Sequence, residues 1–348
     1  MKIEDFPLAP SGKSGWPWTE VASSIVPPNG VEYPKITLVT PSFNQGEFIE
    51  ETIRSILLQN YPNLEYIIID GGSTDNTIEI IKKYEKHLTY WISEKDNGQS
   101  DAINKGLKIS TGEIFNWLNS DDYYPPGALN KVAKLFADPK VELVCGQSNI
   151  FNSERSFISP QSEGFDVDKN IICHSRINQP ATFFRMNIIK ELGTLSTQLH
   201  YCMDLEWWMK YLFAHGHKNI LNTNDVLVNF REHENSKTIN QADLFIKDKF
   251  ILYSGILFNK NPVVRSFDGY KFEADLSKVP AIFIYSLSNF LFFYYLVNYY
   301  GSRELKGVRA ILPFIIVDHL EPAQQVLFNQ IRFRSKYVPS WLYKMFGE

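Results

Sequence analysis

A hydrophobic run ends in two adjacent acids in the stretch Ile114-Phe115-Asn116-Trp117-Leu118-Asn119-Ser120-Asp121-Asp122. The run is typical of a buried strand, and we expect the two carboxylates to emerge together at its C-terminal end. Like charges held side by side repel, and their desolvation is costly unless a positive group binds there. A divalent metal ion carrying a diphosphate would meet that requirement. The alternative is a solvated acidic turn before Pro125-Pro126-Gly127, and the surrounding chain decides between the two.

Short apolar runs alternate with amphipathic stretches on the N-terminal side of this segment. The expected strands are residues 36–40, 66–69, 90–92 and the run ending at Asp121. The expected helices are residues 47–59, 75–86 and 101–109. This alternation predicts an α/β fold, a Rossmann-like and mostly parallel sheet flanked by helices, in which ligands bind at the carboxyl ends of the strands.

Polar side chains follow each expected strand. These clusters are Asn44, Asp70-Gly71-Gly72-Ser73, Glu94 with Asp96-Asn97-Gly98, and Asp121-Asp122. Because the carboxyl ends of parallel strands share one edge, we expect the clusters to form a single site rather than four independent solvated turns.

The rest of the chain falls into three kinds of sequence. Residues 1–34 hold several prolines without periodicity, which predicts an extended arm anchored by Trp16 and Trp18. Beyond Gly127 we expect a helix to Ala137, strands at 141–144 and 181–185, and a helix over 203–215 with Asp204 in its first turn.

The last hundred residues are rich in aromatics. Val279 to Ser302 lack formal charge, but Pro280 and several tyrosines make a membrane span marginal. The tail from Pro322 to Gly347 carries cations and no acid, which suits an anionic membrane surface. Docking at a membrane interface and a helical core or oligomerisation module are the main interpretations, ahead of a true span.

Bulk composition restricts the class of protein. The net charge of −4 argues against a nucleic-acid partner. Cys145, Cys173 and Cys202 are widely separated, which fits a reducing compartment. The N-terminus lacks the apolar core of a signal peptide. We therefore expect a cytoplasmic protein, peripheral on the cytoplasmic face of the inner membrane if it docks there.

The strand-end side chains suit a nucleotide sugar. A hard cation on its diphosphate prefers carboxylate oxygens and water, which Asp121 and Asp122 supply. Asp70 can accept a hydrogen bond from a base or ribose, and the Gly71-Gly72 pair lets a flat ring approach closely. The alternative is a tight turn in which Asp75 caps the next helix, and we expect that cap in either case.

Three ordered motifs resemble the nucleotide-binding half of family-2 glycosyltransferases, which have a GT-A fold. The motifs are Thr-Pro-Ser-Phe-Asn at 40–44, Asp-Gly-Gly-Ser-Thr-Asp at 70–75 and Asn-Ser-Asp-Asp at 119–122. The resemblance covers Ile36 to Leu129 and extends faintly to about residue 238. It implies sugar transfer from a nucleotide donor with inversion at the anomeric carbon, assisted by Mg²⁺ or Mn²⁺. Asn119 and Gly71 stand where the family often has acids.

The same resemblance implies roles for individual residues. The implied donor contacts are Thr40, Pro41, Asn44, Asp70, Asp101 and Asp121. Asp101 is otherwise an ordinary acid in the first turn of a helix. The implied metal ligands are Asp122, which would carry most of the metal grip, and His233, which alone would be a surface histidine.

The base and the acceptor contacts lie further along the chain. Direct displacement needs a base to take the proton of the acceptor hydroxyl, and the resemblance implies Asp204, with Glu206 as the competing carboxylate. Gln179 and Glu206 are weaker candidates for contact with the acceptor.

These inferences predict a domain organisation and a function. We expect an arm at 1–34, a catalytic domain at 35–238 whose halves 35–129 and 130–238 bind nucleotide sugar and acceptor, and a helical, aromatic-rich extension at 239–348. The enzyme would use a UDP-sugar and elongate a glycan or lipid-linked glycan, and its C-terminal helices could join copies of the chain. The alternatives are a polyprenyl-phosphate sugar synthase and a catalytically silent sugar-nucleotide or glycan-binding module.

Two further enzyme classes are disfavoured by missing motifs. The chain has no Gln-x-x-Arg-Trp segment, which argues against processive polymerisation. A dehydrogenase would show a Gly-x-Gly-x-x-Gly turn after the first strand, where this chain has Pro41-Ser42-Phe43-Asn44-Gln45-Gly46.

Overall fold

The structure is a computed structural model that describes residues 2–23, 33–164, 175–234, 236–237, 242–260, 270–274, 296–301, 305–315, 317–320 and 322–337. The chain forms two compact units. The first is Met1–Glu163 with Arg176–Gln241, and the second is Gly164–Ser175 with Ala242–Glu348.

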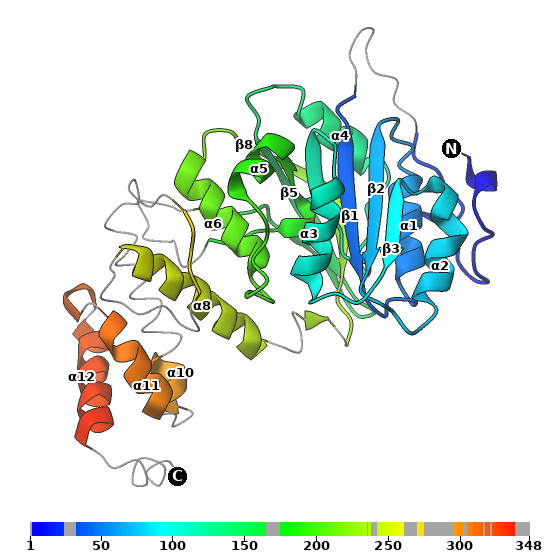
Figure 1. Ribbon diagram of the computed structural model, residues 1–348. Coiled ribbons are helices and arrows are strands. Elements are labelled where there is room, and N and C mark those ends of the chain that lie inside the picture. The colour runs from blue at the N-terminus through cyan, green and yellow to red at the C-terminus, as the bar shows by residue number, and fades with distance from the viewer. Residues whose placement is uncertain are drawn as a thin grey trace. The chain divides into compact units, whose positions relative to one another are not determined.

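The first half of the first unit alternates strands and helices as predicted (Figure 1). In chain order these elements are β1 (Ile36–Ser42), α1 (Ile49–Leu57), β2 (Leu64–Asp70), α2 (Thr77–Tyr84), β3 (Tyr90–Ser93), α3 (Gln99–Ile109) and β4 (Ile114–Trp117). β1 lies parallel to β2 and β4, and β2 lies parallel to β3. Their carboxyl ends share one edge, where Ser42 is paired with Asp70 and Asp70 with Ser93.

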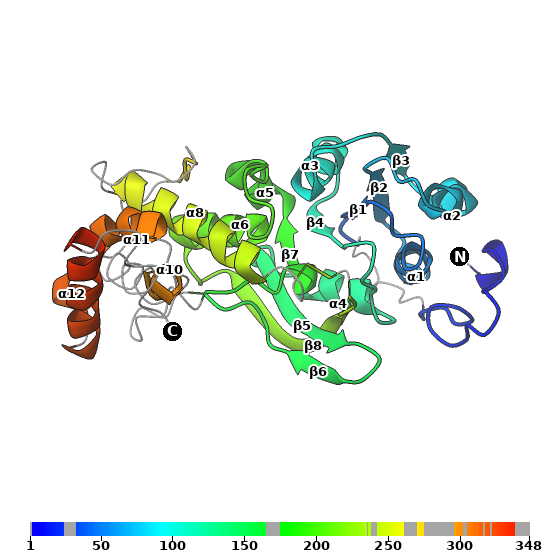
Figure 2. The ribbon, with the colours of Figure 1, turned by 90° about the horizontal axis from the view of Figure 1, so that it is seen from below.

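The second half extends the same sheet with mixed strands (Figure 2). Its elements are α4 (Ala128–Leu135), β5 (Leu143–Phe151), β6 (Ser156–Ser159), β7 (Thr182–Arg185), α5 (Met186–Leu192), α6 (Met203–His215) and β8 (Ile220–Arg231). The strand order is β3-β2-β1-β4-β7-β5-β6, with β8 beside β5. β7 is antiparallel to β4 and β5, whereas β8 is parallel to β5. The predicted α/β class is confirmed, but β6 and β8 were not predicted.

The strand before the two acids is shorter than predicted. β4 ends at Trp117, and the N–H of Leu118 makes a last bond to the carbonyl of Val39. The chain then turns, because the N–H of Asp122 donates to the carbonyl of Asn119 at 3.2 Å. The expectation that the strand continues to Asp121 was therefore wrong, since the apolar run ends in a turn.

Helices cover both faces of the sheet. Leu38, Ile68 and Ile114 pack in one buried cluster with residues of α1, α2 and α4. On the other face, Gly106 of α3 lies so close to β1 that an added Cβ would stand 2.6 Å from the Val39 side chain. The helix can pack this closely only without a side chain at that position.

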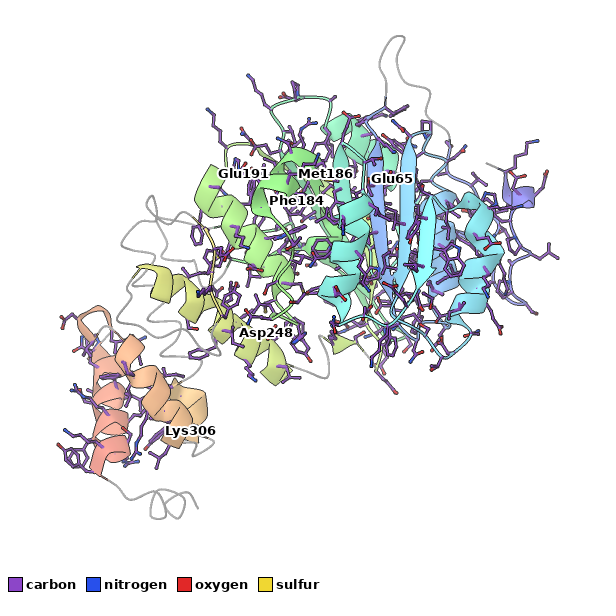
Figure 3. All side chains as sticks on the ribbon, viewed as in Figure 1. Glu65, Phe184, Met186, Glu191, Asp248 and Lys306 are labelled. Carbon is purple, nitrogen blue, oxygen red and sulfur yellow. The ribbon has the colours of Figure 1, made fainter. Side chains whose placement is uncertain are left out.

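Phe184 of β7 joins the two halves of the sheet. It is paired with Phe115 of β4 on one side and with Leu143 of β5 on the other. Figure 3 labels Phe184 among the side chains of the first unit. Its ring lies 6.0 Å from the ring of Trp207 on α6. This aromatic contact fixes α6, and with it Asp204, against the sheet.

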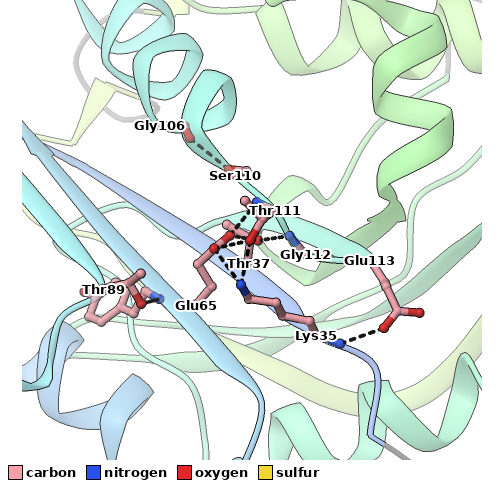
Figure 4. A network of polar contacts seen from close by, with 10 residues as sticks. Lys35, Thr37, Glu65, Thr89, Gly106, Ser110, Thr111, Gly112 and Glu113 are labelled. Atoms are coloured by element: carbon pink, nitrogen blue, oxygen red, sulfur yellow. Dashed lines mark hydrogen bonds and ion pairs between the residues drawn. The ribbon is translucent and has the colours of Figure 1, made fainter.

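The edge of the sheet opposite the carboxyl ends of the parallel strands is held by a buried carboxylate (Figure 4). Glu65, near the start of β2, accepts hydrogen bonds from the Thr111 N–H at 2.7 Å and the Thr111 hydroxyl at 2.5 Å. The Thr37 hydroxyl donates at 2.5 Å, and the Lys35 ammonium lies at 2.9 Å. One side chain thereby ties together the starts of β1 and β2 and the turn after α3.

The N-terminal arm is bound by a single buried arginine. Arg54 of α1 is 1% exposed and donates to the carbonyls of Pro7, Pro17 and Trp18 at 2.8–3.1 Å. Trp18 is buried, and the indole N–H of Trp16 donates to a backbone carbonyl at 2.7 Å. The predicted anchoring of the arm by Trp16 and Trp18 is confirmed, but Arg54 was not foreseen.

The described part of the second unit is helical. Its helices are α8 (Ala242–Lys260), α10 (Val297–Gly301), α11 (Leu305–Ile311) and α12 (Pro322–Tyr337). None of the described helices is long and apolar enough to cross a membrane. The uncharged stretch 279–302 lies outside the described residues except for 296–301.

Candidate functional site

The acidic turn places Asp122 in the interior. Its side chain is buried, and its Oδ1 accepts a hydrogen bond from the backbone N–H of Arg231 at 2.9 Å. Its Oδ2 is also buried and has no hydrogen-bond partner among the described residues. Burial, and secondly the negative charge of Asp121, raises the pKa of Asp122 well above its usual range. Burial thus disfavours the charged form of this carboxyl, and a positive charge close by would stabilise it.

Asp121 lies nearer the surface and meets His233. Its side chain is 23% exposed, and its Oδ2 lies 3.1 Å from Nε2 of His233. The centre of the imidazole lies 4.6 Å from the centre of the Phe48 ring. The backbone N–H of His233 donates to the Ser236 hydroxyl at 2.9 Å. A carboxylate oxygen and an imidazole nitrogen thus adjoin beyond the ends of β4 and β8.

Arg231, the last residue of β8, fixes this arrangement. Its guanidinium donates to Glu51 at 2.8 Å and to the backbone carbonyl of Asp121 at 3.1 Å. Three aromatic rings lie within 4.8–5.7 Å of the guanidinium carbon; they belong to Phe48, Tyr123 and Phe151. The three rings and the ion pair with Glu51 restrict the conformation of the Arg231 side chain, and its hydrogen bond to the Asp121 carbonyl then positions the acidic turn.

Asp70, at the end of β2, is completely buried. Its oxygens accept from the N–H groups of Gly72 and Ser73 at 3.1 and 2.9 Å, and from the hydroxyls of Ser73 and Ser93 at 2.5 and 2.6 Å. The carboxylate therefore shapes the glycine turn. Its predicted contact with a donor stays a prediction.

The end of β1 is tied to this turn through Asn44. Asn44 has a left-handed backbone, with φ of 51°; its N–H donates to Ser73, and its Oδ1 accepts from the Thr74 N–H at 2.8 Å. Thr40 and Pro41 are buried in the strand. Buried oxygens of Ser42 and Gln45 have no partner among the described residues; they are Ser42 Oγ and Gln45 Oε1.

The third strand end contributes two more carboxylates. Asp101, in the first turn of α3, accepts from the Asn97 N–H at 3.0 Å and lies 3.7 Å from the Lys105 ammonium. An added Cβ at Gly71 would stand 2.6 Å from the carboxylate of Asp96. The carboxylate of Asp96 thus occupies the space that a side chain at position 71 would need.

A short polar chain connects the acidic turn with the segment before α6. The Gln99 side-chain nitrogen Nε2 donates to Oδ1 of Asn119 at 2.7 Å, and the Lys237 ammonium donates to Oε1 of Gln99 at 3.0 Å. Lys237 also donates to the His200 carbonyl at 3.4 Å. Sequence reasoning missed Gln99 and Lys237, because nothing local indicates that residues this far apart in the chain meet.

Asp204 lies in the first turn of α6 as predicted, where its Oδ1 accepts the Leu205 N–H at 2.8 Å. It is partly exposed. Glu206 is buried, and its oxygens pair with the Ser196 N–H and the Lys210 ammonium. Asp204 is therefore the more accessible of the two candidate bases.

Gln179, the other candidate for the acceptor, is also buried. Its amide donates to Asn116 at 3.0 Å and to the Trp117 carbonyl at 2.9 Å. These bonds join β7 to β4. Gln179 and Glu206 thus have structural partners, which leaves little of either side chain for an acceptor.

Comparison with known proteins agrees with this geometry. The sequence matches glycosyl transferase family 2 over residues 37–209. It is 28% identical over 233 residues to an uncharacterized glycosyltransferase of Rickettsia typhi, covering 64% of this chain and 72% of that protein. It is 38% identical over 103 residues to TuaG of Bacillus subtilis, covering 28% of this chain and 40% of TuaG, whose name assigns it provisionally to teichuronic acid biosynthesis.

The fold is similar to that of a solved structure. Residues 1–349 of S. aureus TarS, crystallised in complex with UDP, superpose with a TM-score of 0.62 at 18% identity. The match covers 90% of each chain. At this identity, the similarity extends to the fold.

Proposed function

The chain belongs to glycosyl transferase family 2 and is a glycosyltransferase, and from this premise we propose that it moves a sugar from a nucleotide-sugar donor to a hydroxyl of a glycan or lipid-linked glycan, with inversion. The observation that carries the proposal is the meeting of Asp121 with His233 at the strand ends. Gln99 and Lys237 connect that pair to the segment just before Asp204. One edge of the sheet thus holds a candidate cation site and a candidate base.

The donor base would lie against the ends of β1 and β2. Phe43 is 58% exposed there, beside the turn that Asn44 ties to Ser73. An exposed ring next to glycines without side chains suits stacking of a flat base. The UDP complex of TarS supports a uridine nucleotide, and the name of TuaG supports a surface glycan as acceptor.

The side chains at the acidic turn fit a divalent metal, but we assign the metal to Asp121 and not to Asp122, which the family resemblance implied as the ligand. Asp121 and His233 offer partly exposed oxygen and nitrogen donors 3.1 Å apart. Among the described residues no cluster of three metal-binding side chains occurs, so diphosphate and water would complete the coordination, as is usual for Mg²⁺. The imidazole suits Mn²⁺ better than Mg²⁺. Asp122 then stands behind the site, and its unpartnered Oδ2 would be stabilised by the nearby positive charge.

The bound cation would neutralise charge on the departing nucleoside diphosphate. Arg231 holds the acidic turn, so that Asp121 does not have to reorganise when the donor arrives. Asp204 would take the proton from the acceptor hydroxyl as its oxygen attacks the anomeric carbon from the side opposite the diphosphate. One displacement of this kind inverts the anomeric configuration.

Thermal unfolding with UDP and Mn²⁺ tests the donor half of the proposal. Saturation to about 100 times Kd stabilises a protein by about 2.7 kcal/mol, which raises Tm by roughly 5–10 °C for a unit of this size. We expect that rise to need both ligands and to be lost in Asp121→Asn. The matched control is Asp138→Asn, an exposed acid after α4, which should behave as wild type. A full shift in Asp121→Asn would refute the assignment.

The acceptor half is tested by product analysis. Membranes incubated with labelled UDP-sugars should incorporate label into glycan. Label found only on a simple polyprenyl phosphate would replace the elongation proposal with the synthase. Absence of both transfer and donor hydrolysis across the panel would favour a silent binding module.

A further inference from the structure

Helix α12 presents an apolar stripe to solvent. Val326, Phe333 and Tyr337 are 59%, 62% and 61% exposed. At 100° per residue they fall within about 40° of one another around the helix. The opposite face is packed inward through Phe328, Ile331 and Ser335. Within the part of the chain that the structure describes, the stripe is therefore an unpartnered face of a helix whose other face is already covered.

Cations flank this stripe on both sides. Arg334 lies on one flank, where it donates to the Tyr300 hydroxyl, and Lys336 and Arg332 lie on the other. The Lys336 ammonium stands 5.1 Å from the Tyr337 ring centre. No acid occurs in α12, although the whole chain has a net charge of −4. The local charge is thus opposite in sign to that of the protein.

We propose that α12 docks this chain on an anionic lipid surface, lying in the interface with Phe333 and Tyr337 among the acyl chains and its cations among the headgroups. An exposed apolar face bordered by Lys and Arg is the pattern of interfacial helices. At 16 residues, α12 is too short to span a bilayer. A second copy of the helix is the poorer occupant, because it would bring the same cations against each other.

Vesicle co-sedimentation of the full chain tests the proposal. We expect the protein to bind vesicles of phosphatidylcholine with roughly one-third phosphatidylglycerol and to bind pure phosphatidylcholine much less. The triple variant Arg332→Gln/Arg334→Gln/Lys336→Gln should bind the anionic vesicles about a hundredfold more weakly, since each cation near such a surface contributes about fivefold. Phe333→Ser alone should weaken binding about tenfold.

A second triple variant serves as the matched control. Lys82→Gln/Lys83→Gln/Lys86→Gln makes the same change in net charge on exposed positions of α2 and the following turn, and it should bind like wild type. Equal loss in both triples, no binding by wild type, or binding that is insensitive to Phe333→Ser would overturn the proposal. So would a concentration-dependent dimer in sedimentation that the α12 triple abolishes, because the stripe would then join two copies.

Discussion

Replacing Glu65 by Gln should destabilise the first unit in a pH-dependent way. Burial by itself raises the pKa of Glu65, but the hydrogen bonds from Thr111, Thr37 and Lys35 together outweigh it and lower the pKa from 4.5 to about 2. Each unit by which the folded pKa lies below the unfolded one is worth about 1.4 kcal/mol. Ionised Glu65 therefore contributes about 3 kcal/mol at pH 7. Since the folded pKa is depressed, this stability is present above pH 4.5 and is lost as the pH falls towards 2.

Urea unfolding followed by tryptophan fluorescence measures the effect. Six of the seven tryptophans lie in the first unit, so the signal reports that unit. Gln resembles the protonated carboxyl, and we expect Glu65→Gln to lower the free energy of unfolding by about 3 kcal/mol at pH 7. At pH 3.5 the difference between wild type and variant should narrow by about 1.4 kcal/mol.

The control is Glu113→Gln at the same edge of the sheet. The Glu113 carboxylate accepts a hydrogen bond from the backbone N–H of Lys35 at 3.1 Å. Glu113 is exposed, so water can take its place as the acceptor. Glu113→Gln should therefore change the free energy of unfolding only slightly at both pH 7 and pH 3.5. A gap between wild type and Glu65→Gln that is the same at pH 7 and pH 3.5 would refute the reasoning, because the carboxylate charge would then not be what holds the strands.

Three other perturbations probe the arm and the site. Arg54→Leu should lower the free energy of unfolding by about 2–4 kcal/mol, because three carbonyls lose a charged donor, and limited proteolysis should cut residues 2–23 faster; a wild-type cleavage rate would contradict this. Arg231→Lys keeps the charge but loses the fork and the stacking, so the Kd for UDP with Mn²⁺ should rise about tenfold, and an unchanged Kd would show that the clamp is dispensable. Phe43→Ser should weaken UDP about tenfold without altering binding of inorganic pyrophosphate; equal losses for both ligands would mean that Phe43 does not stack on the base.

Local patterns predict the parallel half of the fold. The runs at Ile36 and Tyr66 are apolar on both sides because both faces of those strands are covered by helices, and such runs are readable without tertiary context. β8 escaped prediction for the opposite reason. Its burial is mostly partial, and it is held by pairing with residues of β5 that lie 77–80 positions earlier in the chain, from Leu143 opposite Ile220 to Phe151 opposite Arg231.

The candidate site is predictable by position and less so by role. Strand ends bring Asp70, Asp101 and Asp121 to one edge, which follows from parallel topology alone. The sequence does not reveal that the Asp122 side chain turns inward. That orientation depends on a hydrogen bond from the backbone N–H of Arg231, which lies 109 residues further along the chain. Arg231 in turn depends on Glu51, 180 residues away. Roles set by such long-range partners need the folded chain.

Transfer by Asp204→Asn, measured beside donor binding, tests the central claim most directly. With labelled UDP-N-acetylglucosamine, the sugar nucleotide bound in one TarS structure, as the first of a panel of UDP-sugars, we expect the variant to bind UDP and Mn²⁺ with the wild-type Kd. Its transfer to the membrane glycan fraction should fall by about 10²–10⁴. Transfer at a near wild-type rate, or loss of donor binding together with transfer, would contradict the account.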